Sequence, residues 1–101
     1  NTNRMTVESD TFADGAVIFN GLKSRSVTLN TRTHKIKVDY ADATYLGIWA
    51  KRGAQYVCIE PWFGVNDFAD TDYSFSEKPG ILALDTGKHF DYSVKISFEK
   101  I

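Results

Sequence analysis

The clearest pattern of hydrophobic and polar positions lies near the end of the chain. Between residues 90 and 99, aromatic or aliphatic side chains alternate with charged or small polar ones. A period of two is that of a β-strand with one face on a core and the other in water. HKIKVDY (residues 34–40) and RSVTLN (residues 25–30) repeat the pattern. We therefore predict three half-exposed strands over these ranges.

Other segments are more continuously apolar. YLGIWA (residues 45–50) and QYVCIE (residues 55–60) flank the short link KRGA. This arrangement predicts a hairpin whose strands are covered on both faces. Shorter apolar runs at residues 16–20 and 81–84 predict two further strands.

Helical periodicity is confined to a single predicted turn near residues 10–13. Residues 66–80 have no apolar period and predict a polar loop dotted with aromatic side chains. Strands spaced by about 8–12 residues with turn signals between them are typical of antiparallel sandwiches and barrels. The sequence therefore predicts an all-β fold, an antiparallel β-sandwich.

Composition narrows the classes of function. The 101 residues suffice for one domain, or for part of a larger one, with a buried core. Twelve basic and thirteen acidic residues leave a net charge of −1, which gives no field for holding nucleic acid or an anionic membrane. No apolar run approaches the roughly 20 residues of a membrane span. We expect neither kind of partner.

Cysteine and acidic residues give few signs of metal chemistry. Cys58 is the single cysteine, so an internal disulfide and a multi-cysteine metal site are excluded, and a cytoplasmic setting fits best. It is interpreted as an inert thiol. Three aspartates of the predicted loop, Asp67, Asp70 and Asp72, lack the glycine and the terminal glutamate of a calcium loop. We expect no metal.

The most informative local feature is CIEPWFG, residues 58–64. Its carboxylate, Glu60, follows an apolar run and is followed by a proline and two aromatic rings, Trp62 and Phe63. Burying a carboxylate is costly unless it is paired or neutralised. Pro61 restricts Glu60 to an extended backbone and lacks a ladder donor. The strand is therefore expected to end at Glu60 or just past it, at the rim of a sheet.

Two interpretations of this carboxylate stay open on its chemistry alone. A carboxylate fixed beside aromatic rings suits a general base, and the ring faces suit the apolar side of a sugar. The structural alternative is that Glu60 pairs with a cation such as Lys78 and that the rings only pack. Trp49 is assigned to the core, whereas Trp62 fits either the core or a sugar platform.

Several motifs, taken in order, resemble one known family. LGIWAKRGAQYVCIEPWFG followed by EKPGILALDTGKHFDYSVKI is similar to the C-terminal part of the aldose 1-epimerase (galactose mutarotase-like) family, in its lactose-operon mutarotase-like branch. DTFADGAVIFNGLKSRSVTLN resembles the same branch, so the similarity extends from about Asp10 onward. Full-length members are several times longer than this chain. The only methionine is Met5, so the sequence does not begin at an initiator residue. We expect residues 1–101 to be one sandwich segment, a C-terminal fragment of a larger mutarotase-like domain.

The resemblance implies an activity and residue roles. Members are β-supersandwich proteins that interconvert the α and β anomers of aldoses without a cofactor. The family's glutamate in this block is the general base and corresponds to Glu60. A substrate-holding aspartate before a short apolar strand corresponds to Asp14, although Gly15 departs from the commoner pattern. The expected ligand is a small-molecule sugar, held beside Trp62 and Phe63.

The family's general acid and its partner are histidines of the N-terminal portion. Neither His34 nor His89 lies in a matching motif, and both are interpreted as surface or strand-end residues. The isolated chain is therefore expected to be inactive without the missing N-terminal portion of the same protein, and its exposed strand edges would invite association. The alternative function is a non-catalytic carbohydrate-binding β-sandwich module.

Overall fold

The computed structural model describes residues 3–65, 74–75 and 77–101, and within them it contains β-strands and no helix. The predicted loop aspartates 67, 70 and 72 lie outside the described residues. Because these ranges hold no helix, none of them provides an apolar helix of membrane-spanning length. The strands are β1 (Val17–Asn20), β2 (Ser26–Asn30), β3 (His34–Asp39), β4 (Tyr45–Trp49), β5 (Cys58–Trp62) and β6 (Lys95–Lys100).

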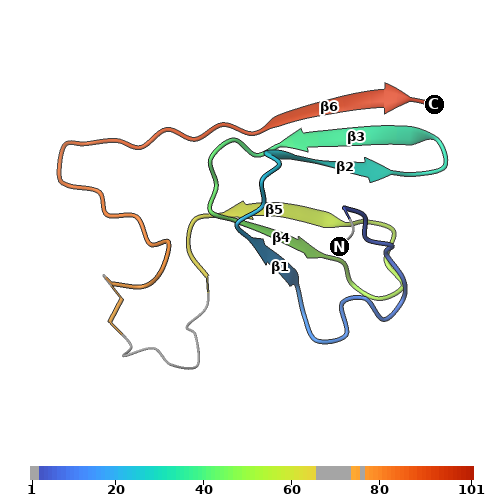
Figure 1. Cartoon of the computed structure of the whole chain (residues 1–101), viewed down its shortest axis with the longest axis horizontal. Helices are drawn as coiled ribbons and strands as arrows, with labels where there is room; N and C mark the ends of the chain where they lie inside the picture. Colours follow the sequence, from blue (N-terminus) through green and yellow to red (C-terminus); the bar gives the residue numbers. More distant parts are fainter. Residues whose placement is uncertain (1–2, 66–73, 76) are drawn as a thin grey trace.

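The strands form two antiparallel three-stranded sheets, in the orders β1-β4-β5 and β2-β3-β6. Figure 1 shows one sheet above the other, with the chain crossing between them after β1 and again after β3. The predicted all-β, antiparallel, sandwich-like fold is confirmed. We call the sheet of β1, β4 and β5 sheet A, and the sheet of β2, β3 and β6 sheet B.

The buried core lies where the chain passes from sheet B to sheet A. Tyr40 and Ala43 come from the β3–β4 connection, and Leu46 and Ile48 come from β4; all four are buried. Half-buried side chains from both sheets and from the connections surround them, namely Phe12, Phe19, Val27, Val57, Ile59, Phe63 and Tyr92. Val38 and Tyr45 are also buried. Six buried hydrophobic residues are still a small core, so polar contacts that tie the connections together add to the order of the fold.

Arg25 makes the most connected of these polar contacts. Its guanidinium donates to the backbone carbonyls of Leu22 (2.8 Å), Ala43 (3.1 Å) and Ala41 (3.3 Å). It also lies 5.0 Å from the centroid of the Tyr40 ring, within cation–π range. Leu22 precedes β2 and Ala43 precedes β4, so one side chain joins the first two crossings between the sheets.

The predicted hairpin of β4 and β5 is confirmed, with Tyr45 opposite Trp62 and Trp49 opposite Cys58. The predicted limits of its second strand are wrong. The link is longer than KRGA because β5 begins at Cys58, and the strand then continues through Pro61 to Trp62. β5 is the edge of sheet A, where a proline facing the open side breaks no ladder bond.

The alternating segment near the end of the chain is only partly a strand. β6 pairs with β3 from Lys95, opposite Asp39, to Lys100, opposite His34. β3 ends at Asp39, so residues 90–94 have no partner strand among the described residues and are not a strand. The short strand predicted over residues 81–84 is likewise not formed. A period of two is kept, but a strand exists only where a neighbour supplies hydrogen bonds.

Tyr92 shows what replaces strand pairing in this segment. Its hydroxyl donates to the backbone carbonyl of Tyr40, and its ring meets Phe63 edge to face at 5.0 Å between centroids. Tyr92 therefore fastens the segment before β6 onto the core. Near the other end of the chain, the turn predicted around residues 10–13 is observed: the Ala13 N–H donates to the Asp10 carbonyl at 3.1 Å.

Candidate functional site

Glu60 lies in the middle of β5, on the edge strand of sheet A. It is directly opposite Gly47 of β4, which in turn is opposite Ile18 of β1. Because side chains alternate along a strand, Glu60 shares one face with Cys58 and Trp62, while Ile59 packs on the core from the other face. The carboxylate is thus carried by the middle of an edge strand and not by the end of a strand.

The indole of Trp62 lies against Gly47, the residue directly opposite Glu60. A Cβ atom built on Gly47 would be 2.9 Å from Cζ2 of Trp62 and 3.1 Å from Cε2. The ring therefore fills the space that a side chain opposite Glu60 would occupy. Residues directly opposite in an antiparallel pair have Cα atoms about 4.5–5.5 Å apart. The structure therefore brings two predicted site residues, Glu60 and Trp62, together.

Tyr45 and Gly80 form the end of this face. Tyr45 is opposite Trp62 and is buried. Gly80, with a φ of 78°, comes so close to the Tyr45 ring and to the carbonyl of Phe63 that a Cβ atom would collide with both. The chain therefore returns to sheet A here, and only glycine satisfies both the left-handed backbone and the close contact. Tyr45 and Gly80 give the Trp62 end of the site a fixed boundary.

Glu60 is half-buried, and among residues 3–65, 74–75 and 77–101 it has no ion-pair partner. The alternative in which a Glu60–Lys78 ion pair explains the carboxylate is therefore not observed. A carboxylate without a cationic partner keeps its oxygens available to accept a proton or a hydroxyl hydrogen bond. This is the state that a general base requires.

Phe63 has different surroundings from Trp62. Its ring packs against the core and meets two other rings edge to face, Phe90 at 5.3 Å and Tyr92 at 5.0 Å between centroids. These contacts occupy the ring in packing. The geometry thus favours Trp62 over Phe63 as the aromatic surface next to Glu60.

Asp14 is not brought beside Glu60. The β1 residue level with Glu60 is Ile18, and Asp14 comes four positions earlier, in the turn before β1. That turn is closed by the Gly15 N–H donating to the Phe12 carbonyl at 3.0 Å, with Gly15 at a φ of 104°. Asp14 is exposed, so it is free to meet a ligand that extends along the sheet.

Neither histidine belongs to a strand of sheet A. His34 begins β3 in sheet B, where its Nδ1 is 2.8 Å from Oγ1 of Thr33. His89 is exposed and lies 3.5 Å from the carboxylate of Asp91. Within the described ranges, no three histidine, cysteine or acidic side chains cluster as metal ligands would. Neither histidine forms a hydrogen bond or an ion pair with Glu60.

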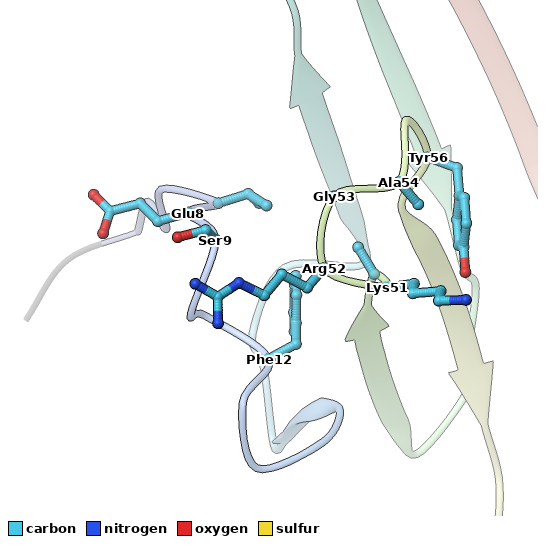
Figure 2. A pocket seen from close by; sticks show the side chains of 10 residues that line it. Glu8, Ser9, Phe12, Lys51, Arg52, Gly53, Ala54 and Tyr56 are labelled. Carbon is cyan, nitrogen blue, oxygen red and sulfur yellow. The ribbon is translucent and has the colours of Figure 1, made fainter.

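A shallow cavity of about 220 Å³ opens at the far end of sheet A, between the N-terminal segment and the β4–β5 link. Figure 2 shows Arg52 reaching across it toward Ser9, with Phe12 below and Tyr56 on the opposite side. Glu60 does not line it. Small-molecule sites usually measure about 300–1,000 Å³, so this hollow alone is small for one.

Sequence reasoning missed Gly47 and Arg25. Gly47 could have been found, since a glycine inside an apolar strand often marks the close approach of another group. Arg25 carries no such signal, because its carbonyl partners at Ala41 and Ala43 are distant in sequence. The cavity was also missed, since its walls come from segments without a hydrophobic period.

Comparison with known proteins gives one kind of match. The chain is similar to Protein LacX. The plasmid and chromosomal forms of this protein from Lactococcus lactis subsp. lactis are each 30% identical over 94 residues. The match covers 87% of this chain and 31% of each relative, so the chain spans about a third of the length of these curated relatives. No family model and no solved structure matches.

Proposed function

We propose that the chain is the C-terminal part of an aldose 1-epimerase-like protein and that Glu60 is its general base. The observation that carries the proposal is the placement of Glu60: half-buried, without an ion-pair partner among the described residues, and directly opposite Gly47, which the indole of Trp62 covers. The ordered motifs that resemble this family and the similarity to Protein LacX support it.

The proposed reaction interconverts the α and β anomers of an aldose. Glu60 takes the proton of the anomeric hydroxyl while an acid gives a proton to the ring oxygen, so the C1–O5 bond breaks and an open-chain aldehyde forms. The aldehyde turns about its C1–C2 bond. Closure on its other face, with both protons returned, gives the other anomer. One positioned base contributes on the order of 10² to 10⁴ in rate.

The remaining roles follow from the same placement. Trp62 offers an apolar ring face to the C–H side of the sugar. Asp14 is assigned to a hydroxyl farther along the sheet, and Phe63 to fixing the chain just after β5. The acid comes from an N-terminal portion of the same polypeptide, which makes that portion the required partner. With Cys58 as the single cysteine, we place the protein in the cytoplasm.

The test is anomer exchange, measured by NMR or polarimetry on the complete polypeptide to which this chain belongs. Glu60→Gln keeps the size of the side chain and removes the base, so the rate is expected to fall at least about a hundredfold. Glu8→Gln is the matched control, because Glu8 is exposed and lies outside β5. Equal exchange by the wild type and Glu60→Gln would remove Glu60 from the mechanism.

A second candidate function is sugar binding without chemistry. One observation favours it: neither histidine lies on sheet A, so the described part of the chain offers Glu60 no histidine acid. In this case tryptophan fluorescence would respond to added sugar, while the complete polypeptide would exchange anomers no faster than buffer does. Acceleration of exchange would exclude this alternative.

A further inference from the structure

β6 forms one of the two edges of sheet B, and β2 forms the other. The sheet order β2-β3-β6 leaves β6 with a neighbour on one side only, and all six of its residues are exposed. Figure 1 shows β6 along the outer margin of the structure. Nothing in the described residues covers this edge, and an uncovered edge strand is a template for pairing with another chain.

The backbone groups available at this edge follow from the register. The Ile101 N–H donates to the Thr33 carbonyl at 2.7 Å, so the backbone N–H of Ile101 is directed toward the β3 side of the sheet. Backbone direction alternates along an antiparallel strand. The even-numbered residues of β6 (Ile96, Phe98 and Lys100) therefore point their N–H and C=O groups to the open side.

The side chains of the edge continue the apolar face of sheet B. Val38 is opposite Ile96, and Ile36 is opposite Phe98. The exposed fraction rises outward, from 5% for Val38 to 54% for Ile96 and 71% for Phe98. An apolar layer that is buried in the middle of the sheet and open at its edge is the profile of a sheet that lacks a neighbour.

We propose that β6 is the docking surface for a second copy of this chain, which pairs antiparallel with it about Ser97. In this register Ile96 is opposite Phe98 of the second copy, and their edge-facing backbone groups form the narrow hydrogen-bonded pair. Lys95 is then opposite Glu99 of the second copy, on the other face. The two-fold axis produces each of these pairs twice. Two identical β6 strands are therefore complementary to each other in both charged and apolar side chains.

Shifting the register by two residues loses this match. Moving the axis to Phe98 places Ile96 opposite Lys100 and Ser97 opposite Glu99. Moving it to Ile96 places Lys95 opposite Ser97. Only the axis at Ser97 pairs both charges with opposite charges, and it joins the two sheets into one continuous apolar face. This inference does not depend on the proposed function, because it concerns sheet B and not Glu60.

The test is the mass of the 101-residue chain in solution, measured by sedimentation over a hundredfold range of concentration. The wild type is expected to reach twice 11.4 kDa. Lys95→Glu and Glu99→Lys each put like charges opposite one another at both pairs, so each is expected to raise the dissociation constant at least tenfold. Ile96→Pro removes only an N–H that faces the open edge and is expected to give a folded monomer.

Mixing the two charge variants supplies the decisive control. Each variant also disturbs a contact inside its own chain, since Lys95 is opposite Asp39 and Glu99 is opposite Lys35. Mixing does not change this defect within each chain. In a dimer with one copy of each variant, however, position 95 of each copy again faces an opposite charge at position 99 of the other. An equimolar mixture should therefore recover dimerisation. A wild type that stays monomeric, or variants that do not recover on mixing, would overturn the proposal.

Discussion

The indole ring of Trp62 covers Gly47, the residue directly opposite Glu60. This contact decides how close an aromatic face lies to the carboxylate, because any side chain at position 47 would occupy the same space. The pairing is diagonal across two strands, a geometry in which long aromatic side chains reach their neighbours. A methyl group at Gly47 is therefore the smallest change that separates the ring from the sheet.

Gly47→Ala should destabilise the fold by about 1–3 kcal/mol, as overpacking a tight contact generally does. The reason is the 2.9 Å approach between a Cβ atom and Cζ2 of Trp62. Urea unfolding followed by tryptophan fluorescence measures the loss, together with a shift in the native emission. Gly64→Ala is the control, since its Cβ would meet Ile81 at an ordinary 3.7 Å. Equal stability of the two variants would contradict the contact.

Arg25→Ala should cost about 1–2 kcal/mol, because four carbonyl contacts, including the one from Nε to Ser24, are lost at an exposed side chain where water replaces part of them. Arg25→Lys should recover only part of this, since an ammonium group cannot reproduce the planar fork. Thermal unfolding checks both variants. Arg32→Ala, at an exposed arginine between β2 and β3, should change little. A full recovery by lysine would show that charge alone matters.

Tyr92 should make stability depend on alkaline pH. Burial, and next the charge of Asp42, raise the pKa of Tyr92 above its ordinary value of 10.0. Above that pH the unfolded chain releases the phenolic proton while the folded chain keeps it. The free energy of unfolding therefore falls as pH rises from the ordinary pKa to the raised one.

Tyr92→Phe should remove this part of the alkaline loss and also cost about 1 kcal/mol at neutral pH, because the Tyr40 carbonyl loses one of its two donors and keeps only the Ala43 N–H. Denaturant unfolding at neutral pH and again above pH 10 measures both effects. Tyr56→Phe is the control, since Tyr56 is 49% exposed. An alkaline loss of the same size in wild type and Tyr92→Phe would assign it to other groups.

Trp62→Ala should weaken sugar binding by the complete polypeptide about tenfold, which corresponds to roughly 1.4 kcal/mol. Trp49→Phe should leave the affinity nearly unchanged, because the Trp49 ring lies 6.3 Å from Tyr56, at the other end of the hairpin. Calorimetric titration separates the two variants. Equal loss of affinity in both would move the sugar platform away from Trp62.

The sequence was most informative where local pattern and strand partner agree. The alternation in β2 and β3 and the apolar runs of β4 and β5 predicted the right strands, since each finds a neighbour in the chain. The same alternation failed over residues 90–94, where no partner is present in the described part of the chain. Period therefore fixes which face of a segment is apolar, whereas hydrogen-bonding partners fix where a strand begins and ends.

The candidate site was predicted in part for a similar reason. Glu60 and Trp62 are two residues apart, so strand alternation alone puts them on one face. Phe63 is adjacent in sequence, yet the rings that enclose it, Phe90 and Tyr92, come from a segment nearly thirty residues later. Asp14 lies in the turn before β1, four positions ahead of Ile18, the β1 residue level with Glu60. Contacts of this range depend on sheet order, which a hydrophobic period does not encode.

The clamp made by Arg25 bears on the order in which the chain assembles. Arg25 and Ala43 are 18 residues apart, so bringing them together closes a short loop at modest entropic cost. The four strands from β1 to β4 can then condense as an early nucleus. β5 would then pair with β4, and β6 with β3, so the two edge strands complete sheets whose inner strands are already in place.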